Sequence, residues 1–307
     1  MLDYHLHLWP HSAAETPLRV EQLSAYCAAA QAAGVGELAV TEHLFRFRQA
    51  EAALGGFWRD EKTPPALADS MAQYWRFHAR ADLDTYVECV LEAKSAGLPI
   101  VLGLEVDYYA GRMDEVARLL ADYPFDVLLG SVHWLGAWRF DDLSDPVSME
   151  QWSCREVDAV WDSYTTALEE LAASRTCDVL AHPDLVKVAG SVPAAPAEWW
   201  ARIAEAAQSS GMAAEVSSAG WRKPVLEQYP AEGLLRELVA RRVPLTTASD
   251  AHCLDEVADR VGDLRRLLSG MGVEALQGYR GRRPYAAPVA PGDAAPLAPG
   301  DAAEVDA

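Results

Sequence analysis

The chain has 307 residues, half of them hydrophobic, and a formal net charge of -20 at pH 7. Apolar residues in short blocks along such a length can bury one large core, and α/β barrels of about 250 residues fold as single domains. Nucleic-acid binding requires clustered lysine and arginine. We therefore expect an acidic, solubilising surface and no nucleic-acid partner.

The sequence predicts no association with a membrane. Its longest apolar runs fall far short of the ~20 residues of a transmembrane helix. The N-terminus begins almost directly with DYHLHL, unlike the charged and then apolar pattern of a signal peptide. Five cysteines are scattered along the chain and are odd in number. Together these features favour a cytoplasmic protein with reduced thiols.

Short apolar segments alternate with longer helical patterns. The apolar segments lack polar alternation and predict strands of a parallel sheet buried on both faces. They are Leu2–His5, Glu37–Thr41, Ile100–Glu105, Val127–Ser131, Val179–Ala181, Ala213–Val216 and Leu245–Ala248. The predicted helices are Val20–Ala33, Leu83–Ala96, Arg112–Ala121, Glu156–Ala173, Pro196–Ser209, Pro230–Ala240 and Val257–Leu268. Seven alternations predict a single α/β domain, a barrel of about seven units rather than an open sheet.

Two stretches interrupt this alternation. Phe45–Ala81 is long, aromatic and irregular in pattern, and it follows His43 directly. It is either a flap over a site or an ordinary packed insertion, and His78 within it is interpreted as structural or as part of the flap. Residues 286–307 are rich in Ala and Pro and contain no aromatic residue. They predict a disordered tail after a folded domain at residues 1–285.

Histidines recur at the ends of the predicted strands, where a barrel gathers side chains at one mouth. His5 and His7 lie one residue apart, so an extended strand presents both on one face. The alternative is a pair of surface histidines on an edge strand. Asp250 and His252 repeat the same spacing after the last predicted strand. Two such pairs favour a metal site over isolated surface histidines.

Further candidates follow the middle strands. Glu105 closes an apolar strand, where a carboxylate is costly to bury unless it is paired or binds a cation. Asp107 competes with it two residues later. His133 and His182 each follow an apolar strand, and either alone is more often a hydrogen-bonded core histidine than a ligand. Within the whole series we interpret them as ligands of first-row divalent metals.

An ordered series of motifs resembles the metal motifs of the PHP (polymerase and histidinol phosphatase) family. Over residues 2–285 the chain carries, in this order, DYHLHLWPH, TEH, GLEVDY, GSVHWLGAW, AHPDLVK, EVSSAGWRKP and ASDAH. A lone H-x-H is a weak signal, whereas the ordered series is specific. The resemblance, strongest to the bacterial histidinol phosphatases of that family, implies a distorted seven-unit β/α barrel and a trinuclear cluster of Zn, Fe or Mn.

The resemblance also implies a ligand set of nine residues. The first metal would be held by His5, His7, Glu105 and Asp250, and the second by Glu105, His133 and His182. The third would be held by His11, His43 and His252. Between His7 and His11 the chain is one residue shorter than in some relatives, and some relatives use an aspartate near this place.

The function implied by the resemblance is a metal-dependent phosphomonoesterase that acts on a small phosphorylated substrate, first of all L-histidinol phosphate. Glu105, Asp250 and His252 would serve catalysis at the metals. Arg222 follows a turn of small residues and could clamp phosphate with its planar fork, with Ser218 and Lys187 as further phosphate contacts. A surface ion pair is the alternative for Arg222. A phosphodiesterase or nuclease, a phosphatase for another monoester, and a non-catalytic metal-binding module remain as other functions.

Overall fold

The computed structural model describes residues 1–10 and 18–289, and in them seven parallel strands pair in chain order. They are β1 (Leu2–Asp3), β2 (Glu37–Val40), β3 (Ile100–Asp107), β4 (Val127–Ser131), β5 (Val179–Leu180), β6 (Ala213–Ser217) and β7 (Leu245–Ala248). The first strand also lies against the last, because the N–H of Tyr4 donates to the carbonyl of Thr247 at 2.8 Å and Leu6 bridges Ala251. The sheet is a nearly closed barrel, which confirms the predicted fold class.

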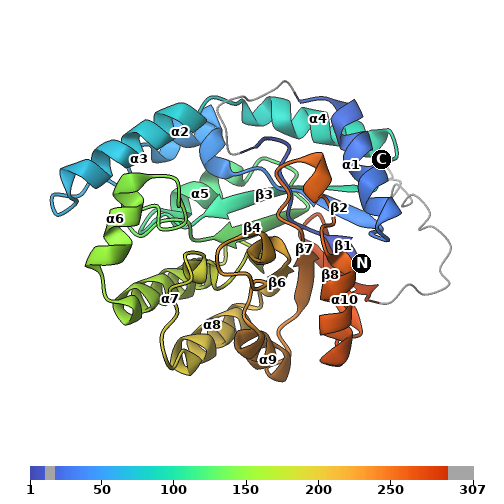
Figure 1. Ribbon diagram of the computed structural model, residues 1–307. Coiled ribbons are helices and arrows are strands. Elements are labelled where there is room, and N and C mark those ends of the chain that lie inside the picture. The colour runs from blue at the N-terminus through green and yellow to red at the C-terminus, as the bar shows by residue number, and fades with distance from the viewer. Residues whose placement is uncertain (11–17, 290–307) are drawn as a thin grey trace.

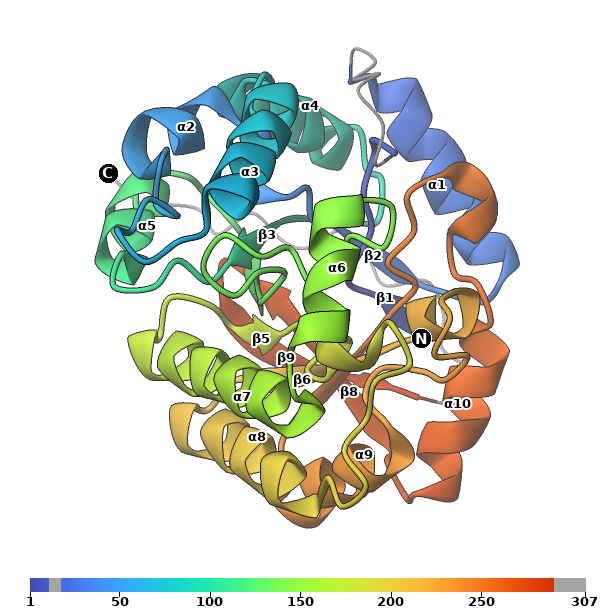
Figure 2. The same ribbon diagram turned by 60° about the vertical axis from the view of Figure 1, so that its left-hand side comes forward.

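Helices surround this barrel on all sides (Figures 1 and 2). The seven helices that the sequence predicted are α1 (Val20–Ala32), α4 (Leu83–Ser95), α5 (Met113–Leu120), α7 (Val157–Ser174), α8 (Ala197–Ser210), α9 (Glu232–Ala240) and α10 (Val261–Gly270). The start of α10 lies four residues later than predicted, because Ala258 and Arg260 adopt positive φ angles before it. In the described part of the chain, no helix is both long and apolar enough to cross a bilayer.

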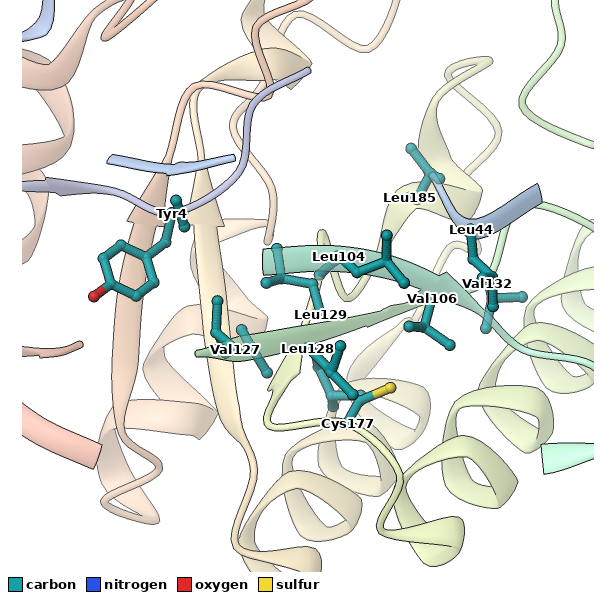
Figure 3. Packing of buried hydrophobic residues seen from close by; sticks show 14 of the residues in the cluster. Tyr4, Leu44, Leu104, Val106, Val127, Leu128, Leu129, Val132, Cys177 and Leu185 are labelled. Carbon is teal, nitrogen blue, oxygen red and sulfur yellow. The ribbon is translucent and has the colours of Figure 1, made fainter. Parts of the chain in front are cut away.

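The neighbouring strands β3 and β4 lie within the hydrophobic core. Every residue of both strands is buried, and Figure 3 shows Leu104 and Val106 packed beside Leu128 and Leu129. Side chains alternate between the two faces of a strand, so a run of apolar residues indicates cover on both faces. Gly130 allows α7 to approach β4, since a Cβ there would lie 2.9 Å from a Leu171 methyl group.

The insertion after β2 is helical, not irregular as predicted. It forms α2 (Arg48–Leu54) and α3 (Pro65–His78). Trp75 of α3 is fully buried, whereas Tyr74 and Phe77 face the cavity described below. The insertion thus packs on the barrel and also forms part of the lining of this cavity. A further helix that the sequence did not predict, α6 (Pro146–Cys154), lies beside α3 in Figures 1 and 2.

An antiparallel hairpin of β8 (Ala275–Arg280) and β9 (Arg283–Pro288) was also not predicted. Glu37 of β2 accepts hydrogen bonds from the side chains of Tyr4, Arg280 and Tyr285, which attach the hairpin to the barrel. The described chain is folded as far as Val289, which is buried. The hairpin thus runs a few residues past position 285, where the sequence predicted the tail to begin, and the rest of the predicted tail lies outside the described residues.

Candidate metal centre

The residues predicted as ligands meet at the carboxyl ends of the barrel strands. Each follows a strand or, for Glu105, lies near its end, and all are buried except Asp250 and His252, which are partly buried. The set found together is His5, His7, His43, Glu105, His133, His182, Asp250 and His252. His11 lies outside the described residues. Strands of a barrel direct such side chains to one mouth, which explains why residues so distant in sequence converge.

The ligand atoms form four overlapping groups of three, and within each group they lie no more than 4.8 Å apart. The groups are His5–His7–Asp250, His5–Glu105–His182, His43–Glu105–His133 and His7–His43–His252. The first resembles the set expected for one metal, and Glu105 is shared by two groups, as a bridging ligand would be. The sets overlap more than expected, since His5, His7 and His43 each belong to two groups.

Glu105 is the centre of the cluster. One of its carboxylate oxygens lies 3.3 Å and 3.1 Å from Nε2 atoms of His133 and His182. The other lies 3.3 Å and 3.6 Å from the Nε2 atoms of His5 and His7, and 2.5 Å from Nδ1 of His43. A fully buried carboxylate therefore faces five imidazoles at once.

Other buried carboxylates hold the outer nitrogens of these imidazoles. Nδ1 of His5 lies 2.7 Å from Glu215, and Nδ1 of His133 lies 2.6 Å from Asp107. A carboxylate behind a metal-binding imidazole fixes its orientation and directs Nε2 toward the metal. Glu215 was not predicted from the sequence, and Asp107 was considered as a metal ligand that competes with Glu105. The structure places Asp107 behind His133.

Glu42 plays a similar part beside β1 and was also overlooked. One of its oxygens accepts from the backbone N–H groups of Leu8 at 2.5 Å and Trp9 at 2.9 Å. Its other oxygen lies 3.6 Å from both Nδ1 of His7 and Nε of Arg46. Glu42 thus fixes the backbone that follows His7. The position of Glu42 directly before His43 in the TEH motif is the sequence feature that could have indicated its role.

The electrostatics of the cluster fit a cation site. Burial disfavours a charged imidazole, but the charges of Glu215 and Glu105 outweigh it and raise the pKa of His5 well above its usual value. Burial lowers the pKa of His43 well below its usual value. Burial would raise the pKa of Glu105, yet the neighbouring imidazoles hold it well below its usual value. An anionic oxygen donor among nitrogen donors is the ligand chemistry of Zn, Fe or Mn.

A cavity of about 740 Å³ opens from the cluster. The metal-binding side of its lining includes Glu105, His133 and Asp250. Another part of the lining comes from α3 and from the loop between β4 and α6, and it is rich in aromatic and acidic side chains. The cavity is thus large enough for a small organic molecule that reaches the cluster.

The structure does not place Arg222 in this cavity. Its guanidinium donates to Asp259 at 3.0 Å and to the carbonyls of Ser249 and Asp250 at 2.8 Å and 3.1 Å. These contacts engage both Nη atoms and favour a structural role for Arg222 over the predicted phosphate clamp. The neighbouring residue, Lys223, lines the cavity instead. Residues 219–222 form a 3₁₀ turn, and successive side chains of a turn point in different directions.

The two other expected phosphate contacts are likewise directed into the protein. Lys187 is buried, and its Nζ lies 2.6 Å from Glu227, 3.0 Å from Asp184 and 2.8 Å from the carbonyl of Gln228. Ser218 is also buried, and within the described residues the cavity lining includes neither Lys187 nor Ser218. Lys187 supports the loop at residues 227–228, and the burial of both side chains favours neither Lys187 nor Ser218 as a phosphate contact.

A nearly closed α/β barrel with imidazoles and carboxylates at the carboxyl ends of its strands defines a barrel protein with a cluster of side chains that could bind metal ions. Residues 3–219 match the PHP domain. The chain is 31% identical over 276 residues to a probable histidinol-phosphatase of Deinococcus radiodurans, a match that covers 89% of this chain and 94% of the relative. The chain belongs to the PHP domain family.

Two solved structures share the fold. One is the histidinol phosphate phosphatase of Lactococcus lactis, solved with zinc, L-histidinol and phosphate. It is 19% identical with a TM-score of 0.65, and the match covers 92% of this chain and 98% of that one. The other is a putative histidinol phosphatase of Listeria monocytogenes, 18% identical with a TM-score of 0.67, where the match covers 86% and 99%. At these identities the likeness establishes a common barrel.

Proposed function

We propose that this protein is a metal-dependent phosphomonoesterase that hydrolyses L-histidinol phosphate to L-histidinol and phosphate. The observation that carries the proposal is the buried cluster of imidazoles around Glu105 at one side of a cavity of about 740 Å³. The relative from Deinococcus radiodurans bears the name of this activity. The structural neighbour from Lactococcus lactis holds zinc with the two products.

The proposed centre contains three divalent ions, with zinc, iron and manganese all suited to its donors. His5, His7, Glu105 and Asp250 would hold one ion, Glu105, His133 and His182 a second, and His43 and His252, together with His11, a third. When bound, the ions supply Lewis-acid chemistry, since they polarise phosphoryl oxygens and make water nucleophilic near neutral pH. With only two carboxylates among the ligands, the centre is strongly positive and suits a phosphate dianion.

The chain's own residues would orient this centre and the substrate. Glu215 and Asp107 hold the imidazoles of His5 and His133 in place through their Nδ1 atoms. Lys223 supplies a positive charge at the cavity wall, and we assign it the phosphate contact that the sequence suggested for Arg222. Arg222 instead holds two carbonyls next to the Asp250 side chain.

The same lining disfavours a nucleic-acid substrate. The loop between β4 and α6 lines the cavity with Asp141, Asp142 and Asp145, whereas a nuclease needs positive charge along the path of the phosphate backbone. A small monoester places its phosphate at the cluster and no second phosphate near these carboxylates. This favours the monoesterase over the phosphodiesterase.

Release of inorganic phosphate tests the proposal. The metal-loaded protein is assayed with L-histidinol phosphate, p-nitrophenyl phosphate, O-phosphoserine and bis(p-nitrophenyl) phosphate at equal concentrations. We expect the highest kcat/KM for L-histidinol phosphate and loss of activity after chelation. Faster cleavage of the diester, or no cleavage of any ester by protein with bound metal, would refute the proposed function.

A further inference from the structure

One carboxylate on the cavity wall has no ion-pair partner in the described chain. Asp141 lies in the loop between β4 and α6, lines the cavity and is partly buried. The ion pairs of this loop are formed by its neighbours Asp142 and Asp145, and none involves Asp141. A carboxylate removed from water without a cationic partner is costly. Asp141 is therefore the acidic group of this wall that is open to a ligand.

The neighbouring carboxylates are committed to the protein. Arg139 donates to both Asp142 and Asp145, the latter at 2.7 Å, and its guanidinium lies 4.2 Å from the centroid of the Tyr74 ring. Asp145 also accepts from the hydroxyl of Ser70 at 2.7 Å. These contacts join the loop to α3, and two carboxylates pair with the single positive charge of Arg139. Three aspartates against one arginine leave this part of the cavity lining negatively charged.

Asp141 lies between the metal-binding side of the cavity and its aromatic wall. Burial raises the pKa of Asp141, and the nearby imidazole of His133 opposes that effect. On the other side, burial and then the charge of Asp141 raise the pKa of Tyr74 in α3. Burial, followed by the charges of Asp184, Asp250 and Asp141, raises the pKa of Tyr229, which also lines the cavity. A ligand that fills the cavity would therefore meet this carboxylate among aromatic rings.

We propose that Asp141 is the binding site for the protonated amine of a small amino-alcohol phosphate, whose phosphate group lies at the cluster around Glu105. An ammonium group supplies the positive charge that Asp141 lacks. The inference rests on the proposed function and assigns a residue to its substrate specificity. Asp141 is thus a specificity-determining residue, outside the set of metal ligands.

The test compares substrates with and without the amine. L-Histidinol phosphate and its deamino analogue, 3-(imidazol-4-yl)propyl phosphate, differ only in that group. For Asp141→Asn we expect the ratio of their kcat/KM values to fall by about 10- to 100-fold, the range for loss of a hydrogen bond to a charged group. Asp141→Glu should recover part of the ratio. The matched control, Asp142→Asn, removes the same charge one residue away and should keep the ratio near that of the wild type.

A binding measurement makes the test independent of turnover. Calorimetric titration of the metal-loaded protein with L-histidinol and with deamino-histidinol should show weaker binding of the amine by Asp141→Asn. Thermal melting checks that the variant is folded. If Asp141→Asn weakens amine and deamino ligands equally, or if the wild type binds both equally, the inference is overturned.

The two proposals fail in different ways. A wild type that cleaves p-nitrophenyl phosphate faster than L-histidinol phosphate would refute the proposed function. If that enzyme still preferred phosphoethanolamine over ethyl phosphate, and Asp141→Asn abolished the preference, the assignment of Asp141 would be supported. A third outcome is a wild type that has its highest kcat/KM among the tested esters with L-histidinol phosphate and an equal kcat/KM with the deamino analogue. That result would support the function and overturn the inference.

Discussion

Nδ1 of His5 lies 2.7 Å from a carboxylate oxygen of Glu215, and both side chains are completely buried. The second oxygen of Glu215 accepts from the backbone N–H of His182 at 3.3 Å. One carboxylate on β6 therefore orients two candidate ligands that come from other parts of the barrel. Glu215 acts through these histidines and not on the substrate.

Replacement of Glu215 by Gln should weaken metal binding by about 10- to 100-fold, since outer carboxylates contribute this much to metal sites. Competition with a chelator measures the affinity, and kcat/KM should fall with it. Glu205→Gln, at an exposed position of α8, is the matched control. Unchanged metal affinity in Glu215→Gln would show that His5 is oriented by its packing alone.

Glu105→Gln should be the most damaging change among the candidate ligands. It removes the charge that faces five imidazoles and is shared by two of the candidate groups. We expect the purified variant to lose at least one ion per chain by elemental analysis and to lose activity by about 1,000-fold or more. Asp107→Asn should cost less, because Asp107 acts through His133. A full metal content in Glu105→Gln would exclude a bridging role.

Lys223 and Arg222 should respond differently to alanine substitution. Lys223→Ala is expected to lower kcat/KM for a monoester by about 10- to 100-fold with metal content unchanged. Arg222→Ala should instead lower the free energy of unfolding by about 1 to 3 kcal/mol, because the carbonyls of Ser249 and Asp250 lose their donor. Urea unfolding and steady-state kinetics separate the two effects. If Arg222→Ala lowered kcat/KM and Lys223→Ala lowered only stability, Arg222 would be the residue that binds phosphate.

His78 should make stability depend on pH. Burial, followed by the charges of Arg46 and Arg139, lowers its pKa from 6.5 to about 4. The folded protein therefore resists protonation that the unfolded chain accepts, so the His78 contribution is present above pH 6.5 and is lost as the pH falls toward 4. The loss is at most about 3 kcal/mol, since water in the cavity screens the ring.

The comparison of wild type with His78→Phe tests this dependence. Urea unfolding of both proteins between pH 4 and 7 gives two profiles, and the candidate metal ligands titrate in both. The difference between the profiles therefore isolates His78. We expect the wild type to lose more stability toward low pH than the variant. Parallel profiles would show that His78 titrates normally in the folded protein.

The parts of this fold that the sequence predicted are those with an unbroken apolar pattern. Val127–Ser131 and Leu245–Ala248 were predicted with their observed bounds, because a strand covered on both faces carries few polar residues. The helix at Pro65–His78 was missed because its aromatic residues serve both the core and the cavity. The hairpin was missed because its turn, Gly281–Arg282, lacks the usual Asn-Gly signal.

In the site, too, some residues could be predicted from the sequence and others could not. Ligands such as Glu105 and His133 were predicted because strand ends share one mouth of a barrel, whatever the details of packing. The contact of Glu215 with His5 depends on which side chains meet across the barrel, and no local pattern records that. The choice between Arg222 and Lys223 depends on the rotation of a single turn. Asp141 could not be recognised because its importance lies in a partner that it does not have.

The closure of the barrel has a consequence for synthesis of the protein. His5 and His7 lie beside Asp250 only when β1 pairs with β7, through Tyr4 with Thr247 and Leu6 with Ala251. A nascent chain that ends before β7 therefore has no complete site, although most of its candidate ligands have already left the ribosome. The complete set of candidate ligands therefore forms only once the barrel is complete. Products of premature termination lack both the closed barrel and the complete centre.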